Sequence, residues 1–184
     1  MSNAYRTNLI QKVLDKSEGN TWNEAVQEWV IDDCEEDDSL ESSCICGKEE
    51  LRYLFTIRNV KNGNTLFPIG SSCIKKFDRA DLNEEVSIQE KLFKLFHAIE
   101  DGSFITLSSK FFSRKLLKYL YDEGVFQANE YNNYNPEIDY EFMLKMFNTH
   151  DKDSITRNRQ GKINAIIMTS IRPYLVEQLK NKIL

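Results

Sequence analysis

The chain has 184 residues, enough for one domain or for two small ones that each bury a core. Apolar residues make up 41% of it and charged residues 29%, which is ordinary for a folded protein and does not favour disorder. The net charge of −5 argues mildly against a dedicated duplex-DNA binder, because such proteins gain much of their affinity by neutralising phosphates.

The N-terminal third is predicted to hold two helices and an acidic connector. Residues 5–16 carry apolar side chains near helical spacing. Thr21 and Glu24 fit a capping box, and residues 22–29 then place four apolar side chains on one helical face. The run DDCEEDDSLESS at 32–43 is interpreted as a solvated acidic connector with one cysteine inside it.

A β-hairpin is predicted next. In LRYLFTIRNV, residues 51–60, apolar and polar side chains alternate as in a half-buried strand, and TLFPI at 65–69 can pair with it. Asn62-Gly63 between them is a strong turn signal, because both residues tolerate positive φ. Pro68 cannot donate a ladder hydrogen bond and therefore marks an edge or a strand end.

From about residue 83 the pattern becomes helical. Before that point, GSSCIKKF at 70–77 is expected to open a short helix with Ser71 or Ser72 as its cap. At the other end of the chain, Pro173 is expected to kink or divide the last helix. Four longer helices are predicted, at residues 86–102, 108–124, 138–150 and 162–184.

The four cysteines, Cys34, Cys44, Cys46 and Cys73, are the strongest chemical signal. Cys44 and Cys46 lie in a tight turn that Gly47 allows the backbone to complete. The hairpin then returns the chain, and Cys73 arrives in the first turn of a helix, where the dipole favours a thiolate. Four thiolates would fill the shell of one structural Zn²⁺ ion, which leaves no position for an activated water.

The order of knuckle, hairpin and helix-borne ligand is typical of a treble-clef-like zinc site. It departs from the usual pattern because only Ile45 separates the close pair and because the fourth ligand comes from upstream. Three alternatives stay open: buried free thiols, disulfides and a redox sensor. The polar surroundings of three cysteines disfavour the first, a reducing compartment disfavours the second, and no reactive thiol stands out for the third.

The segments EAVQEWV, CICG, FTIRNVKNGN and PIGSSCIKKF together resemble an uncharacterised family of small bacterial and phage proteins. Its members carry a Trp-bearing helix, a C-x-C-G knuckle, an I-x-N hairpin and an I-G-S-x-C-I-x-x-F closing segment. Some place a histidine just after the knuckle, where this chain has Lys48 and Glu49. The resemblance covers residues 22–77 and implies a zinc-bearing protein of prophage or mobile-element origin, without an activity. The matching residues are Trp29, Cys44, Cys46, Gly47, Ile57, Asn59, Gly63, Gly70, Cys73, Ile74 and Phe77.

These patterns predict an α+β, mostly helical protein. Residues 5–79 are expected to form N-terminal helices and a treble-clef-like zinc and hairpin unit, and residues 80–184 a bundle of four to five helices. Residues 1–4 are typical of a cloning remnant. No stretch approaches the roughly 18–20 apolar residues of a membrane span, and MSNAYRTN lacks the features of a secretion signal. We therefore expect a cytoplasmic protein with no membrane partner.

The sequence favours a non-enzymatic, zinc-stabilised protein that binds a macromolecule, either protein or nucleic acid. Neither histidine has a nearby nucleophile constellation, and no small-molecule substrate is implied. The alternative is a nucleic-acid-binding regulator that uses a basic helix face at 110–118 and a basic loop at 152–162. Its candidate phosphate contacts are Lys110, Arg114, Lys115, Lys118, Arg157 and Arg159, with Lys152 and Lys162 beside them.

Overall fold

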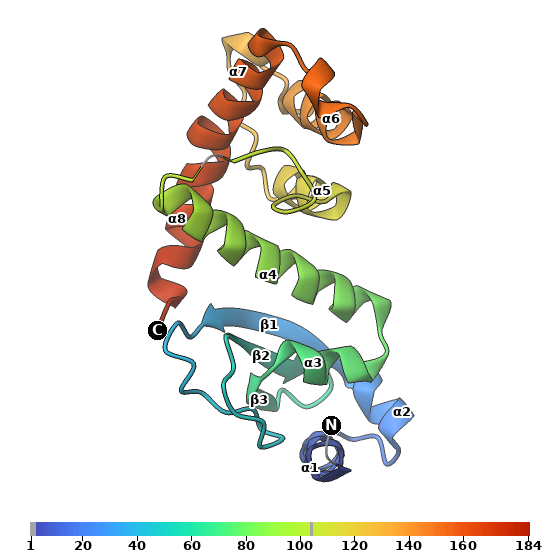
Figure 1. Ribbon diagram of the computed structural model, residues 1–184. Helices are drawn as coiled ribbons and strands as arrows, with labels where there is room; N and C mark the ends of the chain where they lie inside the picture. Colours follow the sequence, from blue (N-terminus) through green and yellow to red (C-terminus); the bar gives the residue numbers. More distant parts are fainter. Residues whose placement is uncertain (1–2, 104) are drawn as a thin grey trace. The chain divides into compact units, whose positions relative to one another are not determined.

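The computed structural model describes residues 3–103 and 105–184, which fold into two compact units (Figure 1). The N-terminal unit comprises the chain up to Gln89 together with Asn181–Leu184. The helical unit comprises Glu90–Lys180.

The chain passes from the N-terminal unit into the helical unit and then returns. The boundary between the two units, after Gln89, lies within helix α4, Ala80–Glu100. After the helical unit, Ile183 forms a parallel bridge with Glu36, and the backbone N–H of Leu184 donates to the Glu36 carbonyl at 2.8 Å. The two ends of the described chain therefore belong to one unit.

Two helical segments open the N-terminal unit. Helix α1 is Asn3–Asp15, and helix α2 is Trp22–Ala25, followed by a 3-10 turn at Val26–Glu28. The predicted capping box is confirmed, since the Thr21 hydroxyl accepts from the Glu24 N–H and the Glu24 carboxylate accepts in return from Thr21. The expected helical face is shorter than its pattern suggests, because the chain enters a strand directly after the 3-10 turn.

A three-stranded antiparallel sheet forms the centre of this unit. Strand β1 is Trp29–Glu36, β2 is Tyr53–Asn59 and β3 is Thr65–Ile69, in the spatial order β1-β2-β3. The hairpin of β2 and β3 follows the prediction. Strand β1 adds a third strand to this hairpin. It pairs with β2, with Trp29 opposite Asn59 at one end and Glu36 opposite Tyr53 at the other.

The acidic run at 32–43 is therefore not the solvated connector that its composition predicts. Its first half lies in β1, and Glu36 and Asp37 are buried. The Glu36 carboxylate accepts a hydrogen bond from Arg52 Nε at 2.7 Å. Asp37 accepts from backbone N–H groups of the loop that follows it. Because each carboxylate has donors, its burial does not leave an unpaired charge.

The hairpin leads into the short helix α3, Ser71–Ile74. Gly63 takes a φ of +75° in the predicted turn, and Pro68 lies in the edge strand β3, as expected. The N-cap of α3 is Gly70 rather than a serine. A Cβ at this glycine would lie 2.9 Å from the Leu51 side chain, so the close approach of these two segments favours glycine.

The core of the N-terminal unit joins the sheet to α3 and to the 3-10 turn Lys75–Phe77 that continues it. Its large side chains come from all three strands and from this helical segment, so the sheet and the helix bury their apolar faces against one another. The most deeply buried of them are Trp29, Phe55, Ile57, Ile69, Ile74 and Phe77.

Among the described residues of the helical unit, four α-helices follow the end of α4. They overlap the predicted helical regions but have different ends: α5 is Arg114–Asp122, α6 is Pro136–Asn148, α7 is Arg157–Ile166 and α8 is Arg172–Leu179. Helix α7 begins five residues before the predicted 162 and takes up the second half of the segment predicted as a basic loop. Between α7 and α8 the backbone forms a π-helix, Ile167–Ile171. This wider turn lies directly before Pro173, where the sequence predicts a break.

Helix α5 is much shorter than the predicted segment 108–124. It begins at Arg114, because the Ser113 hydroxyl accepts from the Leu116 N–H as an N-cap. The two residues before this cap, Phe111 and Phe112, are buried in a non-helical turn.

The observed architecture is α+β, with several helices and one antiparallel sheet. Among the described helices, none has both the length and the apolar character that a bilayer crossing requires.

Candidate metal centre

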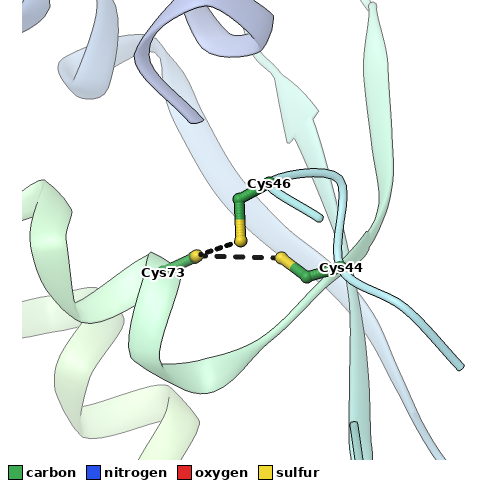
Figure 2. A group of neighbouring side chains, drawn as sticks. All are labelled: Cys44, Cys46 and Cys73. Carbon is green, nitrogen blue, oxygen red and sulfur yellow. Dashed lines mark hydrogen bonds between the residues drawn. The ribbon is translucent and has the colours of Figure 1, made fainter. Parts of the chain in front are cut away.

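Three of the four cysteines lie close together in the N-terminal unit, as Figure 2 shows. Cys44 and Cys46 lie in the loop between β1 and β2, and Cys73 lies in α3. The Cys73 sulfur is 3.7 Å from the Cys44 sulfur and 3.4 Å from the Cys46 sulfur. All three sulfurs lie within 4.8 Å of one another.

Backbone hydrogen bonds shape the knuckle that holds Cys44 and Cys46. The Cys44 N–H donates to the Lys48 carbonyl at 2.8 Å, and the Gly47 N–H donates to the Cys44 carbonyl at 2.7 Å. Gly47 has a φ of +93°, which an L side chain would strain. The predicted role of this glycine is therefore confirmed.

Two contacts from outside the knuckle fix its position. The Ile45 N–H donates to the Pro68 carbonyl of β3 at 2.9 Å. The Asn8 side-chain amide of α1 donates to the Cys46 carbonyl at 3.1 Å. These contacts hold the knuckle against the edge strand whose end leads directly into Cys73.

The cluster is shielded from solvent and favours one thiolate. Cys44, Cys46 and Cys73 expose 4%, 1% and 1% of their surface. The sulfur–sulfur contact with Cys73 and the backbone N–H groups of Cys46 and Gly70 lower the pKa of Cys44, against the opposing effect of burial. The pKa of Cys73 is raised, because its sulfur lies against the Cys44 sulfur and because burial disfavours the charge.

The distances between the sulfurs suit a metal ion better than a disulfide. Bonded sulfurs lie about 2.05 Å apart, and these cysteines are free. A tetrahedral ion that binds sulfur at about 2.3 Å separates its ligands by about 3.8 Å. The separations of 3.7 and 3.4 Å are close to that value, so these three cysteines could hold a metal ion.

The structure does not bring Cys34, the fourth predicted ligand, to this cluster. Cys34 lies in β1 opposite Phe55, and Phe55 lies opposite Ile69 of β3. Two strand spacings, about 10 Å, therefore separate Cys34 from the strand against which the knuckle is held. Its sulfur instead lies 3.7 Å from the Glu35 carbonyl. Within residues 3–103 and 105–184, no fourth cysteine, histidine or carboxylate joins the three sulfurs.

The predicted basic stripe at 110–118 does not form one helix face. Lys110 lies in the turn before α5, so it cannot share the helical spacing of the later residues. Arg114 donates to the Asn148 side chain at 2.7 Å. Lys118 forms an ion pair with Asp122. Arg114 and Lys118, both predicted to contact phosphate, therefore already have partners within the helical unit.

The second basic segment, 152–162, lies partly in a helix, and two of its basic side chains already have partners. Arg157 and Arg159 are exposed in the first turn of α7. Lys152 donates to two carbonyls at the end of α6, and Lys162 pairs with a buried aspartate at 2.9 Å. Lys115 of α5 also has an interaction partner. The two arginines are thus the more available candidates of this set.

Sequence reasoning missed two side chains that lie next to the cysteine cluster. One is Asn8, whose polar side chain on an amphipathic helix gave no sign of a distant partner. The other is Lys76, whose Nζ lies 3.9 Å from the Cys73 sulfur. The i, i+3 spacing of Cys73 and Lys76 in a helical turn was a signal that could have indicated this contact.

Comparisons with protein-family models, with curated proteins and with solved structures found no match for this chain.

Proposed function

We propose that Cys44, Cys46 and Cys73 hold one structural Zn²⁺ ion in a treble-clef-like unit. The observation that carries the proposal is the separation of the sulfurs, 3.7 and 3.4 Å, which is close to the separation of thiolates around a tetrahedral ion. Zinc is preferred because it accepts soft thiolate ligands in this geometry and has no redox chemistry of its own.

The ion would join the knuckle to α3, two segments that the whole hairpin separates in the chain. Its binding to ligands of this kind contributes about 10–16 kcal/mol in small zinc-binding peptides, and that free energy acts as folding free energy. The N-terminal unit would therefore depend on the metal for its stability. The Lys76 cation beside the Cys73 sulfur offsets part of the negative charge that three thiolates bring to the ion.

A non-enzymatic role is supported by the burial of the cluster. Four thiolates would have saturated the ion, whereas three leave one coordination position to a ligand from outside this set. A substrate would have to reach that position, but each of the three cysteines exposes at most 4% of its surface. This burial supports an ion that stabilises the fold rather than one that acts on a substrate. The proposal that the protein acts by binding a macromolecule rests on the sequence alone.

The zinc proposal is tested by metal analysis of protein purified without chelators, with an expected content close to one zinc per chain. Replacement of the ion by Co²⁺ then reports on its ligands, because thiolate-to-cobalt charge-transfer absorption grows with the number of Co–S bonds. The Cys46→Ser variant should lose part or all of this absorption.

The Cys34→Ser variant is the matched control. It should bind the same amount of zinc and keep the full cobalt spectrum, since the Cys34 sulfur lies outside the cluster. Metal-free protein with an intramolecular disulfide among Cys44, Cys46 and Cys73 would refute the proposal and support a redox role. An equal loss of absorption in both variants would instead return Cys34 to the ligand set.

A further inference from the structure

A cleft of about 350 Å³ opens in the N-terminal unit beside the helical segment that carries Cys73. Arg6 of α1 lines one part of it, and Lys75 and Lys76 of the 3-10 turn, with Asp78 after it, line another. Such a volume lies at the lower end of the range for small-ligand sites. It would accommodate one compact group rather than an extended partner.

Three cations line this cleft: Arg6, Lys75 and Lys76. In the part of the chain that the structure describes, the ion pairs of this unit involve other basic residues and leave these three without a carboxylate partner. Among the described residues that line the cleft, Asp78 alone is acidic, so this lining carries a net charge of +2. Residues 1–50 have a net charge of −9, so this positive site contrasts with its surroundings.

The rest of the lining is apolar and includes an aromatic ring. Trp22 is only partly buried and meets Phe77 edge to face, with ring centroids 5.3 Å apart. Leu9 and Ile10 of α1 complete the apolar part. The cleft thus offers two kinds of contact. Its cations can bind an anion, and its indole and aliphatic side chains can pack against a flat or apolar group.

We infer that this cleft binds a phosphate ester that carries an aromatic base, which is the chemistry of one nucleotide. Arginine and lysine are the side chains that bind phosphate through charge-assisted hydrogen bonds. A base can stack on a partly exposed indole, as bases do in single-strand binding sites. A free nucleotide and a terminal nucleotide of a single strand share this chemistry. The inference goes beyond the proposed zinc site and does not depend on the identity of the metal.

The cleft is held by the same contacts that position the cysteine cluster. The Asn8–Cys46 hydrogen bond fixes α1, which supplies Arg6. The Lys76 Nζ lies 3.9 Å from the Cys73 sulfur, so the aliphatic part of the Lys76 side chain lies along the helical segment that carries this cysteine. The site therefore needs little rearrangement to accept a ligand, which lowers the entropic cost of binding.

The experiment is a calorimetric titration of the full chain, metal-loaded as purified, with AMP, adenosine, inorganic phosphate and a short single-stranded oligonucleotide that has a 5′-phosphate. AMP should bind more tightly than phosphate or adenosine, and its affinity should fall as salt is raised. Tighter binding of the oligonucleotide than of AMP would identify a strand as the source of the nucleotide.

Three variants test the lining. Arg6→Gln and Lys75→Gln should each weaken AMP binding about tenfold. Lys12→Gln removes the same charge from the same helix outside the cleft and should leave affinity unchanged. Asp78→Asn should strengthen binding about threefold, because it removes the one negative charge in the lining. Asn tolerates the left-handed backbone at this position, where φ is +54°, so the variant should fold.

The inference is wrong if AMP and adenosine bind equally, or if none of the four probes binds. It is also wrong if Arg6→Gln and Lys12→Gln have the same effect. The zinc content of each variant is measured in parallel. In Arg6→Gln and Lys75→Gln, weakened AMP binding with a normal zinc content supports the role of the cleft. In the unmodified chain, absence of nucleotide binding with a normal zinc content refutes only the role of the cleft, and nucleotide binding by a chain purified without zinc refutes only the metal proposal.

Discussion

Glu28 shows how one buried charge can hold several loops of the N-terminal unit together. Its carboxylate accepts hydrogen bonds from the N–H groups of Glu18 at 2.9 Å and Gly19 at 2.7 Å. It also accepts from the Asn59 amide at 2.7 Å and from Lys61 at 3.2 Å. Burial acts to raise the pKa of Glu28, but these donors outweigh it and lower the pKa to about 2.

We expect Glu28→Gln to lower the free energy of unfolding by about 1–3 kcal/mol at neutral pH, because the charged acceptor of four donors is lost. The folded pKa of about 2 lies below the ordinary 4.5, so the stabilisation is complete above about pH 4.5 and is lost as the pH falls toward 2. Urea unfolding at pH 7 and at pH 3 measures both effects.

The wild-type protein should lose stability between these two pH values, and Glu28→Gln should lose less. Glu41→Gln removes an exposed carboxylate and serves as the control, with a pH dependence like that of the wild type. Parallel pH curves for the wild type and Glu28→Gln would contradict the role assigned to this carboxylate.

At the scale of single elements, the knuckle depends on the backbone of one glycine. A Cβ at Gly47 would lie 3.8 Å from the Tyr5 ring and 3.9 Å from the Asn8 amide, both ordinary contacts. The φ of +93° is therefore the reason for glycine, rather than a lack of space. The strain of a substitution there would fall directly on the two cysteines of the knuckle.

Gly47→Ala should cost about 1–2 kcal/mol of folding free energy and weaken zinc binding. Gly63→Ala is the matched control, because its φ is +75° and a Cβ there would meet nothing within 4 Å. The control should lose similar stability through its backbone but keep its zinc affinity, as measured by competition with a chelator. Equal zinc affinities for the two variants would show that the knuckle geometry does not govern the site.

How far the sequence could predict these elements depends on how local their causes are. The capping box at Thr21 and Glu24 and the turn at Gly63 depend on neighbouring residues, and both were predicted. Strand β1 was not, because the buried Glu36 accepts a hydrogen bond from Arg52, sixteen positions away, which no local pattern indicates. The same limit applies to the metal site: the knuckle spacing identified Cys44 and Cys46, but the register that separates Cys34 from them is a property of the sheet.

For the whole molecule, the division into two units separates two spectroscopic signals. Both tryptophans of the sequence, Trp22 and Trp29, belong to the N-terminal unit. Trp29 is fully buried, and its indole N–H donates to the Ser17 hydroxyl at 2.9 Å. Helices α5 to α8 and the second half of α4 lie within the helical unit, so far-UV circular dichroism reports mainly on that unit, with a smaller share from α1, α2, α3 and the first half of α4. Tryptophan fluorescence reports on the N-terminal unit alone.

If zinc supports the N-terminal unit, a strong chelator should shift tryptophan emission to longer wavelength as Trp29 becomes solvated, because the ion's binding energy is folding energy for that unit. The helical signal should fall only in part, by the share that α1, α2, α3 and the first half of α4 contribute, since the three cysteines lie outside the helical unit. Re-addition of Zn²⁺ should restore the emission. Cys73→Ser should resemble the chelated protein without any chelator, whereas Cys34→Ser should resemble the wild type. Simultaneous loss of both signals would mean that the two units unfold as one, and an unchanged emission would mean that the sheet and its core hold the unit without the metal.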